Sequence, residues 1–174
     1  MWPEVEEYRF DCFIHPNATI GKNVKIGPGT VIYGCVTIKD NVIIGANTTI
    51  GGSGFCFDRE KSPPEREEFK GSVYIGTNVE IGNNCNIDRG RIQTTIWDGA
   101  KIDSLCHIAH DCVIGDDAII AGGTILGGHA QIGDKARVGL NCTLRNRSVV
   151  EYGVIIGMHT PVIRRATKKK TLMA

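Results

Sequence analysis

The chain has 174 residues, a formal net charge of +1 and 41% apolar residues, values typical of one globular domain. The near-neutral balance excludes the strongly basic surface of most nucleic-acid-binding proteins. No apolar run reaches the roughly 18 residues of a spanning helix, and the first residues lack the basic and apolar regions of a signal peptide. We therefore expect no membrane span, no nucleic-acid partner and a cytoplasmic location.

An aliphatic residue occupies every sixth position along most of the chain. The series is Ile14, Ile20, Ile26, Ile32, Ile38, Ile44, Ile50, Ile75, Ile81, Ile87, Ile96, Ile102, Ile108, Ile114, Ile120, Leu126, Ile132, Val138, Leu144, Val150, Ile156 and Val162. Neither an α-helix nor an ordinary strand has this period, so the pattern predicts short extended segments joined by regular turns. Three segments would close a triangular coil of about 18 residues that hydrogen-bonds to its neighbours.

The repeat divides the sequence into a lead-in (1–13), a solenoid (14–163) and a basic tail (164–174). A charged segment with adjacent prolines interrupts it at about 52–72, which predicts a loop extruded from one coil. Long loops on rigid scaffolds are often functional. A second interruption lies near Arg89, where the aliphatic spacing lengthens, so that three extra residues should bulge from the coil.

The seven cysteines match neither the spacing of a metal-binding pair nor a paired disulfide framework. Four of them occupy a slot of the repeat that otherwise holds small residues: Cys85, Cys106, Cys112 and Cys142. A thiol in such a slot is a compact hydrophobic group. We expect reduced cysteines with a packing role.

The segment HIAHDC, residues 107–112, places two histidines three residues apart beside an aspartate. Since residues one coil apart should stack, His110 is predicted to lie next to Gly128, and Asp111 next to His129. The same reasoning, corrected for the bulge, places Arg89 on the other side of His110.

Arg89, His110 and Gly128 thus form a predicted column. This column is flanked by Asp88 and less directly by His107, and it suits acid–base chemistry. A neutral imidazole at His110 can accept a proton, and Asp111 can orient it. A backbone N–H at Gly128 can stabilise an oxyanion. Because neighbours in a repeat are close by construction, the histidines could also simply decorate an exposed corner.

The span from Ile14 to Val162 resembles the hexapeptide-repeat acyltransferases. The order of GSGFCF, VYIGTNVEIGNNCNIDRG and KIDSLCHIAHDCVIGDDAIIAGG resembles most closely the UDP-3-O-(3-hydroxyacyl)glucosamine N-acyltransferases of lipid A synthesis. HIAHDC also resembles the O-acyltransferases that act on UDP-N-acetylglucosamine. The resemblance implies an all-β, left-handed parallel β-helix and a homotrimer with active sites between subunits.

The resemblance also implies roles for particular residues. His110 would be the general base, Asp111 its acidic partner, Gly128 the oxyanion donor and His129 a contact to the acceptor. Arg89, Asp88 and His107 are further candidates for substrate binding. The implied reaction is acyl transfer from acyl-CoA or an acyl carrier protein to the amine of a nucleotide-linked amino sugar, with no bound cofactor.

The sequence departs from these N-acyltransferases at both ends. They carry an N-terminal uridine-binding domain and a helical C-terminal extension, whereas this repeat begins at Ile14 and the chain stops soon after it. The last coils equally resemble sugar acetyltransferases that use acetyl-CoA. Sugar O-acetylation and a non-catalytic scaffold therefore remain alternatives.

Two further features concern ions. The γ-class carbonic anhydrases share the repeat and bind zinc through histidines that include a pair five residues apart, a spacing absent here; we therefore predict no metal site. A basic run follows the last coil and would bind phosphates or remain a solvated tail. Its members are Arg164, Arg165, Lys168, Lys169 and Lys170.

Overall fold

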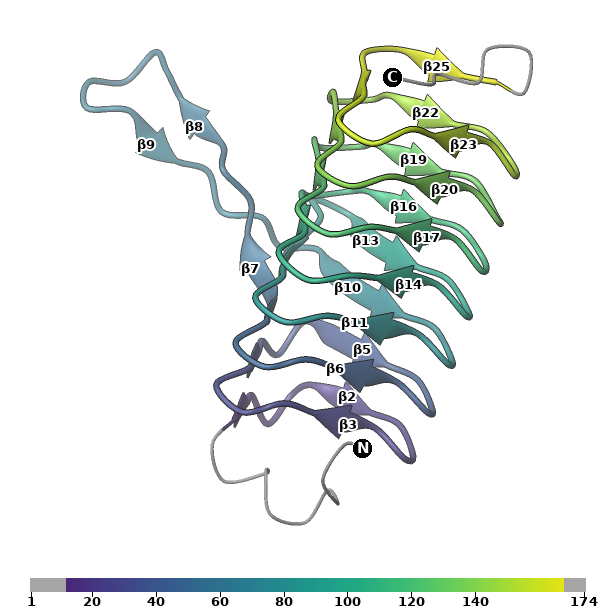
Figure 1. Ribbon diagram of the computed structural model, residues 1–174. Coiled ribbons are helices and arrows are strands. Elements are labelled where there is room, and N and C mark those ends of the chain that lie inside the picture. The colour runs from purple at the N-terminus through teal and green to yellow at the C-terminus, as the bar shows by residue number, and fades with distance from the viewer. Residues whose placement is uncertain (1–11, 168–174) are drawn as a thin grey trace.

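The computed structural model describes residues 12–167. Over this range the chain forms a parallel β-solenoid, as the sequence repeat predicts, and it is the left-handed β-helix that the resemblance implies. Figure 1 shows the coils stacked along one axis from the N-terminal to the C-terminal end. All regular elements in this range are strands, and it holds no helix long and apolar enough to cross a membrane.

Three parallel sheets form the three faces of the solenoid. Sheet A contains β1 (Phe13–Ile14), β4 (Val31–Ile32), β7 (Thr49–Ser53), β12 (Asn86–Arg89), β15 (His107–Ile108), β18 (Ile125–Leu126), β21 (Thr143–Leu144) and β24 (Pro161–Val162). Sheet B contains β2 (Thr19–Ile20), β5 (Val36–Ile38), β10 (Ser72–Ile75), β13 (Gln93–Ile96), β16 (Val113–Ile114), β19 (Gln131–Ile132), β22 (Val149–Val150) and β25 (Arg165–Ala166). Sheet C contains β3 (Lys25–Ile26), β6 (Ile43–Ile44), β11 (Glu80–Ile81), β14 (Lys101–Ile102), β17 (Ile119–Ile120), β20 (Arg137–Val138) and β23 (Ile155–Ile156).

The strand register confirms both the coil and the bulge. Ile108 pairs with Leu126, one regular coil further along the chain. Ile108 also pairs with Ile87 on its other side, a longer step in sequence. The three additional residues are therefore accommodated outside the ladder, and the aliphatic positions stay aligned above and below them.

The hexad side chains fill the interior. From Ile32 to Val162 every aliphatic residue of the series is at most 2% exposed. The four cysteines predicted to pack are buried and free, and burial raises the pKa of the Cys112 thiol to about 12. The Cys112 thiol is therefore a neutral core group, because burial in apolar surroundings disfavours the thiolate.

All irregularities of the repeat lie at one corner, where the chain passes from a sheet A strand to the next sheet B strand. We call the stack of these turns the AB corner. The predicted loop leaves after β7 and returns at β10; it includes a hairpin of β8 (Phe57–Asp58) and β9 (Glu65–Arg66) that projects from the solenoid in Figure 1. The bulge follows β12, and HIAHDC spans the turn after β15.

The solenoid ladder continues beyond residue 163, because strand β25 pairs with β22. Arg165 is part of this strand, and its guanidinium lies 3.3 Å from the Glu151 carboxylate. This additional strand extends sheet B, because the edge of β22 offers backbone N–H and C=O groups for pairing. Residues 1–11 of the predicted lead-in and the three lysines of the basic run lie outside the described residues.

Replacing Ile120 with alanine should lower the free energy of unfolding by about 2 to 5 kcal/mol, because a buried side chain is lost and a cavity remains. Its neighbour Ile119 in β17 is 40% exposed and provides the control. The Ile119→Ala change should cost less than about 1 kcal/mol. Denaturant unfolding followed by circular dichroism measures both, and equal losses would contradict the inward orientation of the hexad residue.

Candidate active site

The AB corner stacks three residues with left-handed backbone conformation above one another. Asp111, His129 and Arg147 have φ angles of 57°, 60° and 63°. The N–H of His129 donates to the carbonyl oxygen of His110 at 2.9 Å, and that of Arg147 to the carbonyl oxygen of Gly128 at 2.9 Å. The corner therefore holds its side chains on a rigid, hydrogen-bonded stack of turns.

His110 and Asp111 form a hydrogen-bonded pair within this stack. The His110 Nδ1 lies 2.9 Å from the Asp111 Oδ2. The side chains are 18% and 8% exposed, so the pair is largely screened from bulk water. With the Nδ1 proton donated to the carboxylate, the Nε2 of His110 is the basic nitrogen.

The three-residue bulge holds the carboxylate of Asp111. The backbone N–H of Arg91 donates to its Oδ2 and that of Ile92 to its Oδ1, each at 3.0 Å. Burial acts to raise the pKa of Asp111, but these two N–H groups and His110 outweigh it, so the pKa lies below its usual value. The bulge thus keeps Asp111 ionised and fixed in orientation.

Gly128 brings bare backbone against the basic nitrogen. A Cβ atom at this position would fall 2.5 Å from the His110 Nε2, so any side chain would displace the imidazole. Gly128 is buried, and within residues 12–167 its N–H donates to no backbone carbonyl. The predicted stacking of His110 on Gly128 is confirmed, and it leaves one backbone donor beside the imidazole.

His129 completes the group from the next turn of the stack. Its Nε2 lies 3.8 Å from the Asp111 Oδ2. Its ring meets that of His110 edge to face, with centroids 5.1 Å apart. One carboxylate thus faces two imidazoles, as the predicted stacking of Asp111 and His129 implies.

Asp88 and His107 form a second polar group on the adjoining strands of sheet A. The His107 Nε2 lies 3.9 Å from the Asp88 Oδ2. The side-chain amide of Asn86 donates to the Asp88 Oδ1 at 2.8 Å and lies 3.0 Å from the His107 Nδ1. Asp88 is only 6% exposed, so these contacts compensate for its burial.

Arg89 follows Asp88 in β12 and pairs with Ser53 of β7. Its guanidinium forms no hydrogen bond or ion pair with another described residue, and its Nε is buried without a partner. The expected proximity of Arg89 to His110 therefore produces no direct polar contact. A role of Arg89 toward a substrate stays a prediction.

The returning end of the loop covers His110, which sequence reasoning did not foresee. Phe69 is 2% exposed and meets the imidazole of His110 edge to face at 4.8 Å. The guanidinium of Arg91 lies 4.6 Å from the Phe69 ring centroid and 2.6 Å from the Glu67 carboxylate. The loop is thus fastened to the bulge, and both help to enclose the imidazole.

A cleft of about 470 Å³ opens beside this group. Its lining residues are Arg91, His110, His129, Arg145, Asn146, Arg147 and Ile163. Arg145 and Arg147 make it electropositive, which suits a ligand that carries phosphate or carboxylate groups. Sequence reasoning missed Arg145 and Arg147, although continuing the coil step from His129 leads directly to Arg147.

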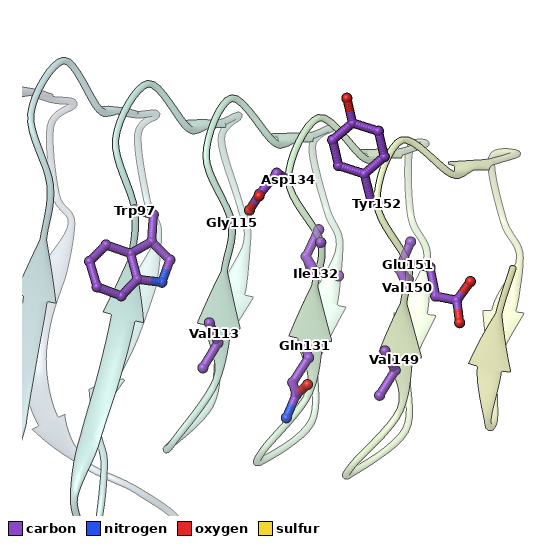
Figure 2. A pocket seen from close by; sticks show the side chains of 11 residues that line it. Trp97, Val113, Gly115, Gln131, Ile132, Asp134, Val149, Val150, Glu151 and Tyr152 are labelled. Atoms are coloured by element: carbon purple, nitrogen blue, oxygen red, sulfur yellow. The ribbon is translucent and has the colours of Figure 1, made fainter. Parts of the chain in front are cut away.

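A second hollow of about 450 Å³ has different chemistry. Figure 2 shows Trp97 followed by Val113, Gln131 and Val149 on successive strands of sheet B, with Tyr152 above this row. Its lining includes two carboxylates and no histidine or arginine. Because it brings no imidazole and carboxylate together, the AB corner is the candidate active site.

Comparison with known proteins agrees with the fold. The model of the bacterial transferase hexapeptide (six repeats) matches residues 17–52 and 94–128. Two segments of the chain therefore match the hexapeptide-repeat family. Among curated relatives, UDP-3-O-acylglucosamine N-acyltransferase of Pseudomonas putida is 41% identical over 101 residues, which cover 58% of this chain and 29% of that protein. The corresponding protein of Helicobacter pylori is 35% identical over 58% of this chain and 38% of its own length.

Solved structures of family members superpose on most of the chain. UDP-N-acetylglucosamine acyltransferase from Campylobacter jejuni is 25% identical with a TM-score of 0.71, over 89% of this chain and 66% of that one. The Francisella novicida UDP-N-acetylglucosamine acyltransferase is 28% identical with a TM-score of 0.61, over 87% and 61%. The hexapeptide-repeat solenoid is thus shared, while this chain spans only part of the length of these proteins.

The Asp111→Asn variant should be less stable at neutral pH by about 1 to 3 kcal/mol, because charge-assisted hydrogen bonds to the carboxylate are lost. The folded-state pKa of Asp111 lies below the usual aspartate value of about 3.9. Its stabilising effect is therefore fully present above that value and is lost as the pH falls through the folded-state pKa. Denaturant unfolding from pH 7 to pH 3 should show the two stabilities converging; a constant difference would refute an ionised Asp111.

Proposed function

We propose that this chain is an acyltransferase that moves an acyl group from a thioester to the amine of a nucleotide-linked amino sugar. The observation that carries the proposal is the His110 and Asp111 pair, whose free Nε2 lies against the bare backbone of Gly128. The curated and solved relatives are named as acyltransferases of UDP-linked glucosamines. Since the chain spans only part of them, the reaction has to be tested on this protein.

In the proposed mechanism, the amine nitrogen attacks the thioester carbonyl carbon while the His110 Nε2 accepts its proton. The resulting imidazolium is stabilised by Asp111, which keeps its charge and its orientation through the N–H groups of the bulge. The intermediate then collapses, the carbon–sulfur bond breaks, and the imidazolium protonates the departing thiolate. His110 thereby serves first as general base and then as general acid.

The N–H of Gly128 is the proposed donor to the oxyanion that forms on the carbonyl oxygen. It lies on the rigid corner beside the imidazole, so that the carbon under attack could meet both groups. One preorganised donor of this kind is worth about 3 to 4 kcal/mol. The absence of a side chain is essential, because a Cβ would collide with the His110 Nε2.

The surroundings of the pair fit the two proposed substrates. The arginines of the cleft would hold the phosphates of CoA, of the prosthetic arm of an acyl carrier protein, or of the nucleotide. His129 would contact the acceptor, and Asp88, Arg89 and His107 would extend the binding surface along sheet A. Acyl-CoA and acyl carrier protein act as donor substrates, so the proposed reaction needs no bound cofactor. We propose that it takes place in the cytoplasm.

We further propose a homotrimer with the active sites between subunits. The interior of the solenoid is filled by aliphatic side chains, so the substrates must lie outside it. The hairpin projects away from its own solenoid in Figure 1, and Phe55, which lies just before β8, is 83% exposed. A large exposed aromatic side chain at the base of a projecting hairpin suits burial against an adjacent subunit.

The His110→Ala variant should lose at least about a hundredfold in kcat/KM, because general-base assistance typically contributes that much or more. His159→Asn serves as the control, since His159 lies at another corner and asparagine accepts its φ of 56°. The assay measures thiol release and amide formation. Activity that survives in His110→Ala would refute the mechanism.

The donor and acceptor are identified by pairing acetyl-CoA and a 3-hydroxyacyl carrier protein with a panel of UDP- and dTDP-linked amino sugars. Turnover with an amine acceptor, and none with a hydroxyl acceptor, is the expected result. Exclusive transfer to a hydroxyl group would replace N-acylation with O-acylation. Absence of turnover together with absence of binding would favour the scaffold alternative.

Sedimentation equilibrium should give a mass of about three times the 18.9 kDa of one chain. Because Phe55 is proposed to lie in the interface, Phe55→Ser should weaken the association. Phe13, an exposed residue of β1 distant from the hairpin, provides the matched Phe13→Ser control. A monomer at micromolar concentration would refute both the trimer and a shared active site.

A further inference from the structure

His110, Asp111 and His129 share one more property: their ligand atoms converge. One ligand atom from each of these residues lies within 4.8 Å of the other two. Although the histidine spacing predicts no metal site, we propose that the His110 Nδ1, the Asp111 Oδ2 and the His129 Nε2 bind a Zn²⁺ ion, and that the bound ion switches off His110 as a base. The zinc site stands on geometry alone, whereas its inhibitory effect rests on the proposed function.

The distances match the coordination sphere of zinc. With ligands at 2.0 to 2.2 Å, neighbouring atoms of a tetrahedral zinc site are separated by about 3.3 Å. The separations from Asp111 Oδ2 to the two imidazole nitrogens are 2.9 Å and 3.8 Å, on either side of this value. Small rotations of the imidazoles would therefore suffice. Two histidines and one carboxylate are also a ligand set that leaves a fourth position for water.

The surroundings hold these ligands in place. The carboxylate of Asp111 is fixed by the N–H groups of Arg91 and Ile92, and hydrogen bonds that orient a ligating group strengthen metal sites. The side chain of His129 is 41% exposed, so an ion can enter from the cleft. The guanidinium of Arg91 is neutralised by Glu67 at 2.6 Å, which limits its repulsion of a cation.

Zinc at this position would reverse the roles of the two nitrogens of His110. In the catalytic tautomer, Nδ1 carries the proton and Nε2 is basic. When Nδ1 binds the metal, a neutral imidazole must carry its proton on Nε2. The nitrogen facing Gly128 is then a donor and accepts no proton from the amine. Metal binding and acyl transfer are therefore mutually exclusive.

The metal site is tested by titrating the full chain with Zn²⁺ alone, using calorimetry and competition with a chromogenic chelator. We expect a site of one Zn²⁺ per chain whose affinity falls at least about tenfold in His129→Asn. The matched control is His159→Asn, since both histidines have left-handed φ angles that asparagine tolerates. Thermal unfolding and sedimentation verify that the variants keep the native fold.

Two results would overturn the site: no such binding to the native chain, or equal affinity in the native chain and His129→Asn. Tetrahedral Co²⁺ absorption that disappears only in His129→Asn would support it independently. The seven cysteines affect the native chain and both variants equally, so the difference between the variants isolates the histidine.

The inhibitory effect is tested by following amide formation by mass spectrometry, because the released thiol itself binds zinc. One equivalent of bound Zn²⁺ should abolish turnover of the native chain, and a chelator should restore it. Unchanged turnover in the zinc-loaded protein would refute the switch. If no acyl transfer is found with any substrate pair, the proposed function fails, while the Zn²⁺ titrations still decide whether the site exists.

Discussion

The aliphatic residue at every sixth position is the constraint on which the rest of the structure depends. From Ile32 to Val162 these side chains are almost completely buried in an interior bounded by three sheets. Burial of one such side chain contributes about 1.5 to 3 kcal/mol, and each coil also satisfies the backbone groups of its neighbours. A coil cannot shift by one residue without exposing its aliphatic side chains and burying polar ones. The solenoid is consequently a rigid frame in which successive coils are stacked at a fixed spacing along the axis.

A filled interior confines chemistry to the outside of the frame. Extra residues are tolerated only where they leave the ladder undisturbed, and in this chain they collect at the AB corner. The loop after β7 and the bulge after β12 enter the same stack of turns as His110. One contributes Phe69, which packs on the imidazole, and the other contributes the N–H groups that hold Asp111. Departures from the repeat thus build the surroundings of the candidate site.

The geometry of this corner joins two kinds of chemistry. A carboxylate kept ionised by backbone N–H groups favours an imidazole that donates through Nδ1, which is the state a general base requires. The same carboxylate lies between His110 and His129, and each of the three residues presents one ligand atom to a cation. Preorganisation for proton transfer would therefore also create the zinc site that we propose. The tautomer of His110 is the single property through which both proposed functions would act.

The sequence by itself determined the solenoid, the coil step, the loop, and the juxtaposition of His110, Gly128, Asp111 and His129. A strict repeat converts separation along the chain into distance in space, so these relations need no knowledge of side-chain conformation. Only the tertiary structure decided the contacts of residues that leave the repeat. Phe69 lies after a long excursion, Arg91 lies in the bulge, and Arg89 makes no polar contact with His110. Their positions depend on the path of the loop and on side-chain rotamers, and a six-residue repeat encodes neither.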